Sequence, residues 1–207
     1  MTDRNGTLQV RGAGRVRVAP DEAIVHLGVM TEGRTAAEAT QSNAKRTEAV
    51  IGAVSAQPNH GVTTMGLGVS PVITYDPHTG VGKIVGFRAT NGVEVKAKVS
   101  QAGPIYDAGV GAGANESSGI TFRVKDEAPY REEALRIAVQ EAHREAQIVA
   151  KATGVELKGL ESIQIEPSGG RVFYRSEAIA SKSTPMPVIP EEATLSAVVQ
   201  IVFRTRD

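Results

Sequence analysis

Apolar and polar residues alternate near the start of the chain, as they do in a half-buried β-strand. The apolar positions are Leu8, Val10, Val16 and Val18, and the polar positions are Gln9, Arg11, Arg15 and Arg17. Gly12 and Gly14 take apolar positions, which indicates a bulge or close packing of the backbone. Pro20-Asp21 breaks the pattern, and the apolar positions from Ala23 to Val29 predict a second strand.

A capping box, Thr35-Ala36-Ala37-Glu38, predicts the start of a helix. At roughly 100° per residue, its inner face collects Ala36, Ala39, Thr40, Asn43, Thr47, Val50, Ile51 and Val54. The helix should end before Pro58. A buried amide without partners costs about 1–3 kcal/mol, so we expect Asn43 to bond the backbone of the sheet. A ligand-binding role for Asn43 is the alternative.

Two further strands flank the turn "DPHTG" at residues 76–80. The first alternates from Met65 to Tyr75. In the second, Asn91-Gly92 resembles a two-residue hairpin turn, but a hairpin there would place Phe87 and Lys96 on one face. The apolar parity continues through this dipeptide, so we expect one long or bulged strand. Asn91 occupies the apolar parity and invites the same interpretation as Asn43.

The rest of the chain predicts a short helix at about 101–113, a strand around Phe122, and a long helix that Gly154 closes. The core stripe expected on the long helix is Leu135, Ala138, Val139, Ala142, Ala146 and Val149. A short strand with Ile163 and Ile165 and a closing strand over 193–203 complete the pattern. We therefore predict a single α+β domain over 1–207. Its mainly antiparallel sheet should pack with an N-terminal helix, a short helix and one long helix in the C-terminal half.

Three apolar groups are candidate contacts between subunits. Ile137 and Ile148 lie on the outward side of the predicted long helix, within a charged rim. The simpler alternative is that two isoleucines on a surface need no explanation. Residues 167–190 have no period and many Pro, Gly and Ser, so they predict a flexible loop within the domain. The clusters inside this loop are Val172, Phe173 and Tyr174, and Met186, Val188 and Ile189.

The stretch "GVGAGANESSGITF", residues 109–122, contains the dinucleotide fingerprint at Gly109, Gly111 and Ala114. A true fingerprint follows a strand and opens a helix, because the pyrophosphate sits on that helix N-terminus. Here the glycines end a predicted helix and precede a strand. We therefore expect close packing of a helix end on the sheet, and no nucleotide cofactor.

Composition removes several classes of function. The formal net charge is zero, from 23 basic and 23 acidic residues, which disfavours nucleic-acid binding. The chain has no cysteine, so disulfides and cysteine-bound metals are excluded. The four histidines are His26, His60, His78 and His143, and none lies in a metal-binding motif. We expect no metal, no cofactor and no catalytic residue, although His26 remains a candidate ligand-binding residue with Asn43 and Asn91.

The ordered pieces of the chain resemble the SIMPL-domain family, whose bacterial members include periplasmic immunogenic proteins. The resemblance rests on "VRGAGRVRVAPDEAIVHLGV", the helix that carries Asn43, "GFRATNGVEVKAK", "GANESSGITF", "EEALRIAVQEAHREAQIVAKATG" and "MPVIPEEATLSAVVQIVF". Gly113, Ala114 and Asn115 match the family's Gly-Ala-Asn turn. The resemblance implies an α+β fold, homo-oligomers in some members, a link to oxidative stress, and no established active site.

Three hypotheses follow. The first is a non-enzymatic homo-oligomer that acts as an assembly or scaffold, with a stress-related role implied by the resemblance. The second is a ligand-binding module, and the third is a hydrolase that uses a histidine. The polar start "MTDRNGTLQV" lacks the apolar core of a signal peptide, and no stretch approaches the roughly 18 apolar residues of a membrane span. The chain as given is therefore expected in the cytoplasm; the alternative is the periplasm or export, if a signal peptide has been removed.

Overall fold

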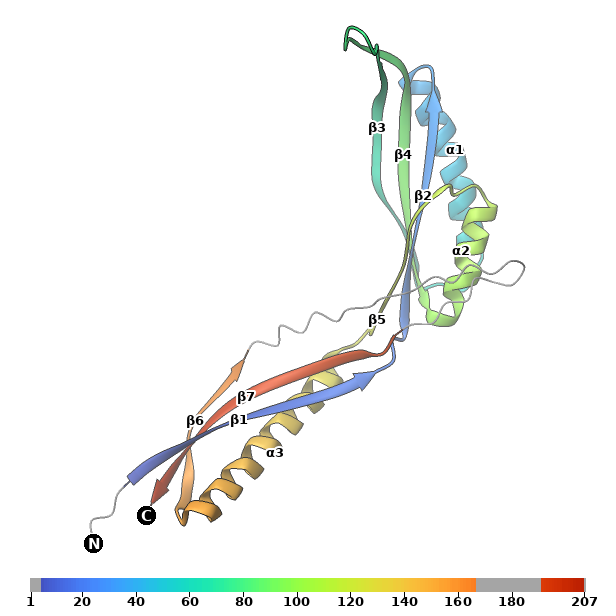
Figure 1. Ribbon diagram of the computed structural model, residues 1–207. Coiled ribbons are helices and arrows are strands. Elements are labelled where there is room, and N and C mark those ends of the chain that lie inside the picture. The colour runs from blue at the N-terminus through green and yellow to red at the C-terminus, as the bar shows by residue number, and fades with distance from the viewer. Residues whose placement is uncertain (1–4, 167–190, 207) are drawn as a thin grey trace. The chain divides into compact units, whose positions relative to one another are not determined.

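The computed structural model describes residues 5–166 and 191–206, and in it the chain folds into two compact units (Figure 1). Unit 1 contains β1 (Asn5–Val18), α3 (Ala128–Thr153), β6 (Glu156–Glu166) and β7 (Ala193–Arg206). Unit 2 contains β2 (Glu22–Gly33), α1 (Ala36–Ser55), β3 (Gly61–Tyr75), β4 (Gly82–Lys98), the 3₁₀ turn η1 (Val99–Gln101), α2 (Ala102–Gly111) and β5 (Glu116–Arg123). All strand pairs are antiparallel, so the predicted α+β class is confirmed.

The strands divide between two sheets, one in each unit, a division that the sequence pattern did not reveal. The prediction of a single domain stays a prediction, and the two units are described separately here. The 167–190 segment, with its two apolar clusters, lies outside the described residues.

Unit 1 is a three-stranded sheet, in the order β1-β7-β6, with α3 packed on one face. Gly12 and Gly14 of β1 lie directly beneath α3. A Cβ atom at either position would collide with a carbonyl oxygen of the helix, that of Ala138 above Gly12 and that of Ala134 above Gly14. Close backbone packing, one of the two predicted explanations for these glycines, is therefore the correct one.

The buried stripe of α3 consists of alanines, at every fourth position: Ala134, Ala138, Ala142, Ala146 and Ala150. This corrects the predicted stripe, because Leu135, Val139 and Val149 are only half-buried. The helix lies so close to the glycines of β1 that only methyl side chains fit between them. The larger residues therefore flank the contact line, and the positive φ of Gly154 ends the helix as predicted.

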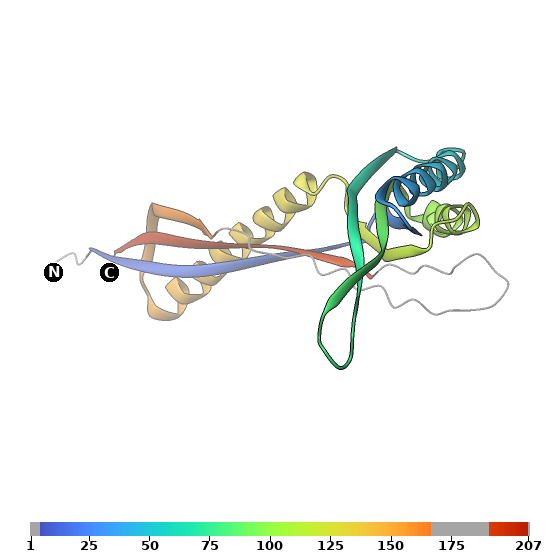
Figure 2. The same cartoon turned by 90° about the horizontal axis from the view of Figure 1, so that it is seen from above.

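Unit 2 is a four-stranded sheet in the order β3-β4-β2-β5. Both α1 and α2 lie on the same side of this sheet (Figure 2). The residues buried between the helices and the sheet include Val25, Val29, Val50, Val54, Val93, Val95, Ile105 and Phe122. β4 runs through Asn91-Gly92 without a turn, so the prediction of one long strand is confirmed.

Asn43 fastens α1 to the two central strands of unit 2. Its side chain is 1% exposed, and its Nδ2 donates to the carbonyl oxygens of Val29, at 2.7 Å, and Ala89, at 3.0 Å. Its Oδ1 accepts the hydroxyl of Thr47 at 3.2 Å. Both polar atoms of the amide are therefore satisfied within the fold, which is the structural role expected for it.

Replacement of Asn43 by leucine should lower the free energy of unfolding by about 1–3 kcal/mol, because two buried carbonyl groups lose a donor and Thr47 loses its acceptor. The measurement is urea unfolding followed by circular dichroism. Ser42→Ala is the matched control, since Ser42 is the exposed neighbour on the same helix and should change stability little. An Asn43→Leu protein as stable as the wild type would refute this role.

Replacement of Gly12 by alanine should destabilise unit 1 by about 1–3 kcal/mol or more, because the added methyl group must push α3 away from β1. The control is Gly52→Ala on α1, where an added Cβ meets no atom within 4 Å. That change should instead stabilise the protein by about 0.5–1 kcal/mol through helix propensity. Thermal unfolding of both variants tests the pair, and equal effects in the two would contradict the packing argument.

Candidate functional site

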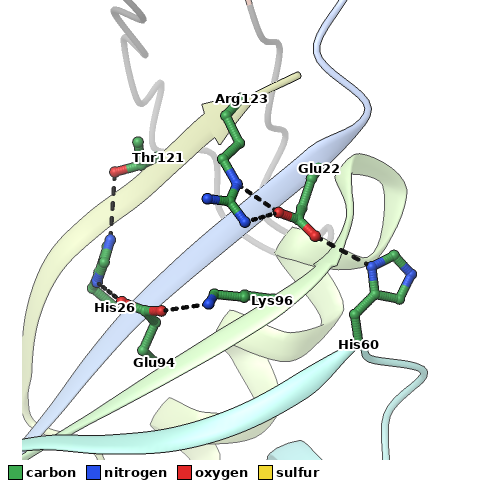
Figure 3. A network of polar contacts seen from close by, with 7 residues as sticks. All are labelled: Glu22, His26, His60, Glu94, Lys96, Thr121 and Arg123. Atoms are coloured by element: carbon green, nitrogen blue, oxygen red, sulfur yellow. Dashed lines mark hydrogen bonds and ion pairs between the residues drawn. The ribbon is translucent and has the colours of Figure 1, made fainter. Parts of the chain in front are cut away.

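The face of the unit 2 sheet opposite the helices carries a network of charged and polar side chains (Figure 3). On β2, Val25 and Leu27 point toward the helices, so Glu22, His26 and Gly28 point to this open face. Glu94 lies directly opposite His26 on β4, and Thr121 comes from β5. The network therefore spans the sheet from β5 to β4.

Glu22 is the most buried member of the network, with a side chain 3% exposed. Its Oε2 accepts the Nε of Arg123 at 2.6 Å, and its Oε1 lies 3.5 Å from Nδ1 of His60. These contacts join the start of β2 to the end of β5 and to the residue before β3. Because this buried carboxylate accepts a charge-assisted hydrogen bond from a guanidinium, we assign Glu22 a structural role.

His26 lies between a hydroxyl and a carboxylate. Its Nε2 is 3.4 Å from Oγ1 of Thr121, and its Nδ1 is 3.9 Å from Oε2 of Glu94. The other oxygen of Glu94 lies 3.6 Å from Nζ of Lys96. The order of groups is that of a nucleophile, a base and an acid, but both distances from the imidazole exceed the reach of about 2.6–3.2 Å for proton transfer. The hydrolase, which was the second alternative in the sequence analysis, therefore gains no specific support from these distances, and it stays untested.

A hollow of about 790 Å³ continues from this network along the open face. Its lining residues are His26, Leu27, Gly28, Met65, Gly66, Thr90, Asn91, Gly92, Glu116, Ser117 and Ser118. Gly28 and Gly92 face each other across β2 and β4 and leave the middle of the sheet without side chains. Glycine inside a strand often marks a place where a ligand or another backbone approaches closely.

The strands on either side of this glycine pair lean over it. A Cβ on Gly28 would lie 2.9 Å from Cβ of Glu116, and a Cβ on Gly92 would lie 2.8 Å from the carbonyl oxygen of Met65. β3 has a bulge beside Gly92, at Gly66, whose φ is +67°. Glu116 and Met65 thus form opposite walls of the hollow, and the two glycines form its floor.

The structure brings His26 to the hollow, whereas Asn43 is buried beneath α1 on the helix side of the sheet. Asn91 lines the hollow only with its backbone, because it pairs with Val29 and its side chain shares the helix-facing parity of Ala89 and Val93. The buried Oδ1 of Asn91 has no hydrogen-bond partner in the described part of the chain. Asn91 therefore lacks the backbone bond expected for that atom. Sequence reasoning missed Glu116 and the pairing of Gly28 with Gly92, because the pairing depends on register.

Two other histidines, His78 and His143, lie outside the polar network. His78 lies in the turn at 76–80, where Oδ1 of Asp76 accepts the backbone N–H groups of His78 and Thr79. These two bonds hold the pKa of Asp76 below its usual value, the bond from Thr79 most strongly. His143 is exposed on α3, with its ring 5.0 Å from that of Phe203 in an edge-to-face contact. Among residues 5–166 and 191–206, no three His, Asp or Glu residues are placed to hold a metal ion.

The glycine-rich stretch lies where the sequence predicted, at a helix end. α2 ends at Gly111, and β5 begins at Glu116. Between them, Asn115 bonds Met30 of β2 twice: its Oδ1 accepts the Met30 N–H at 2.7 Å, and its Nδ2 donates to the Met30 carbonyl at 2.8 Å. This turn runs from helix to strand, the reverse of a dinucleotide-binding turn.

On the helix side of the sheet, β3 and β4 continue beyond the cover of α1. A helix of 20 residues is about 30 Å long, whereas strands of 15 and 17 residues extend for about 50 Å. Val69 pairs with Ala89 and Ile73 pairs with Ile84, on the side that faces the helices further along the sheet. We call Val69, Ile73, Tyr75 and Ile84 the ribbon face; they are 44–65% exposed.

The predicted subunit contacts on α3 differ from one another. Ile148 is 62% exposed, whereas Ile137 is half-buried, in a shallow hollow with Ala13, Glu141 and Arg144. β6 also exposes Leu160, Ile163 and Ile165. The two isoleucines of α3 therefore do not form one uniformly exposed ridge, and their part in oligomer contacts stays a prediction.

Comparison with known proteins identifies two curated relatives and a family. The chain is 24% identical over 218 residues to the 26 kDa periplasmic immunogenic protein of Brucella melitensis, and equally so to that of Brucella abortus strain S19. Both alignments cover 100% of this chain and 87% of the relative. No helix in the described residues is long and apolar enough to cross a membrane. Residues 8–203 match the family SIMPL, described as a protein of unknown function (DUF541), and the chain therefore belongs to this family.

Proposed function

We propose that the protein is a non-enzymatic, homo-oligomeric assembly whose subunits join through the β3–β4 ribbon. The observation that carries this proposal is the edge strand β3. It lies at the edge of its sheet, spans 15 residues and contains no charged residue. An exposed, long and uncharged edge strand pairs readily with another chain, and soluble proteins usually protect such an edge with charges, proline or bulges. β3 has no charges, and its Pro71 and its bulges after Met65 and Val72 leave the segments between them for pairing.

The side chains of the ribbon support the same conclusion. The ribbon face is apolar and uncovered, and Leu67 in the bulge of β3 is 74% exposed. A group of exposed apolar residues on one surface is typical of an interaction site. A two-stranded ribbon is at best marginally stable alone in water, so its outer part gains stability when another surface covers it.

A second copy of the chain is the partner that best fits this surface. β3 presents both an unpaired backbone edge and apolar side chains, and a second copy supplies an identical edge for strand addition. The apolar residues exposed on β6, Leu160, Ile163 and Ile165, offer another apolar surface on the partner copy. The formal net charge of zero presents no overall repulsion between copies.

The site and the relatives support the other parts of the proposal. Nε2 of His26 lies 3.4 Å from Oγ1 of Thr121, beyond the usual reach for proton transfer, so this pair offers no specific support for a hydrolase. The relatives are named as periplasmic proteins, which supports a periplasmic location for this protein, the alternative of the sequence analysis. A stress-related role rests on the family resemblance alone.

The double variant Ile73→Lys and Ile84→Lys tests the assembly. These residues face each other across the ribbon, so two lysines should repel at the proposed contact and expose no new core. Sedimentation velocity should show the wild type above the monomer mass of 21.7 kDa and the double variant at that mass. Circular dichroism should be unchanged, because both residues are already exposed.

Thr74→Lys is the matched control. Thr74 is the neighbour of Ile73 on β3 and points to the opposite face of the ribbon, so this variant should keep the wild-type mass. A wild type that sediments as a monomer at micromolar concentration would refute the assembly. A double variant with the wild-type mass would remove the ribbon as the contact and leave Ile148 and the 167–190 segment as candidates.

A further inference from the structure

We propose that the free edge of β1 in unit 1 binds an extended, acidic peptide segment of another protein by strand addition. β1 is an outer strand of its sheet, with β7 as its neighbour on one side only (Figure 1). This surface belongs to unit 1 and does not involve the ribbon face of unit 2. Three observations carry the proposal: an edge donor that already holds a carboxylate, a row of arginines, and a hollow beside α3.

The backbone N–H of Ala13 shows which groups of β1 point outward. In an antiparallel pair, the backbone groups of successive residues point alternately toward the neighbouring strand and away from it. The N–H of Ala13 donates to Oε2 of Glu141 on α3 at 2.9 Å, so it points away from β7. The backbone groups of Arg11, Arg15 and Arg17 share this parity and therefore also point to the free edge. The bond to Glu141 shows in addition that this edge accommodates a carboxylate oxygen.

The side chains of the same arginines select an acidic strand. Arg11, Arg15 and Arg17 are exposed on the face of the sheet opposite α3, because the glycines of β1 face the helix. Arg11 pairs with Glu166 at 2.8 Å, whereas Arg15 and Arg17 have no ion pair in the described part of the chain. Opposite charges on neighbouring strands attract each other, so acidic side chains on an added strand would meet two unpaired guanidinium groups.

A second copy of β1 does not fit this edge. An antiparallel pair centred on Ala13 would place Arg11 of one copy opposite Arg15 of the other, and the like charges would repel. Charged residues on an edge strand commonly prevent pairing of this kind. The edge strand β3 carries no charge, so it offers no counter-ion to the arginines. An acidic strand from a different protein satisfies both the backbone and the side chains of β1.

The helix provides a place for the other face of the added strand. α3 lies over β1, and Ile137, Gln140, Glu141 and Arg144 line a hollow of about 380 Å³ together with Ala13. Side chains of a strand alternate between the two faces of the sheet, so every second one would point to the side of this hollow. The half-buried Ile137 favours an apolar side chain there. Addition of an extended peptide to a sheet edge, with pockets for alternate side chains, is a common mode of peptide recognition.

Glu141 occupies the binding position in the free protein. An added strand must displace its carboxylate from the N–H of Ala13 and supply a carbonyl oxygen instead. Arg144 lies three residues further along α3 and has no ion pair among the described residues, so it can receive the displaced carboxylate. Removal of this carboxylate should therefore tighten peptide binding, which is the reverse of what a purely structural contact predicts.

Fluorescence anisotropy of the full-length protein with a labelled heptapeptide of alternating glutamate and valine tests the proposal. The acidic peptide should bind saturably, and the same peptide with lysine in place of glutamate should not. The double variant Arg15→Glu and Arg17→Glu should bind the acidic peptide about tenfold more weakly and should bind the lysine peptide instead. Glu141→Ala should bind the acidic peptide more tightly than the wild type.

The double variant Arg34→Glu and Lys45→Glu is the control for charge. Both residues are exposed in unit 2, so this variant should bind as the wild type does. Peptides that are N-methylated at the glutamates or at the valines separate strand addition from charge attraction. One of the two lacks the N–H groups that would face β1, and it should not bind.

The proposal fails if the acidic peptide does not bind saturably, if both methylated peptides bind as the parent does, or if Glu141→Ala weakens binding. It also fails if the charge control loses as much affinity as the arginine variant. Protection of residues 9–17 from hydrogen exchange that rises with protein concentration, in the absence of peptide, would place another copy at this edge and would likewise overturn it.

Discussion

The organisation of unit 2 depends on a difference in length between its helices and its strands. A helix rises about 1.5 Å per residue and a strand about 3.3 Å, so the 20 residues of α1 cannot cover the 17 residues of β4. The sheet is consequently covered near Val93 and Val95, which are fully buried, and bare near Ile73 and Ile84. The same alternation of residues that builds the core thus builds an exposed apolar face where the helix ends.

Strand glycines allow a different close contact in each unit. In unit 1, Gly12 and Gly14 let α3 lie against β1, and the alanine stripe of the helix completes that contact. In unit 2, Gly28 and Gly92 lie on the face without helices, where the neighbouring strands lean over them and leave a hollow. A strand glycine costs stability relative to alanine. In unit 1 the bare backbone admits the close approach of a helix, whereas in unit 2 it lies beneath Glu116 and Met65 of the neighbouring strands.

Much of the fold was predictable because it depends on local patterns. Period-two alternation predicted the strands, the capping box at Thr35 predicted α1, and the register argument at Asn91-Gly92 predicted an unbroken β4. The division into two sheets and the pairing of Gly28 with Gly92 depend on which strands become neighbours, and single-strand patterns carry no such information. The exposure of β3 could have been predicted from the sequence, because the expected lengths of the strands and of the helix already imply an uncovered end.

The two faces of the unit 2 sheet are distinct surfaces. Residues of one parity on β4, such as Ala89 and Val93, face the helices and lead to the ribbon face, whereas Thr90 and Gly92 belong to the opposite face and line the hollow. A second copy on the ribbon face would therefore leave the floor of the hollow open. The two surfaces meet at the bulge at Gly66 and Leu67, where β3 changes from the wall of the hollow to the uncovered ribbon. A bulge is a local adjustment of backbone pairing, so this short segment is where the pairing of β3 with a second copy, on our proposal, would reach the wall of the hollow.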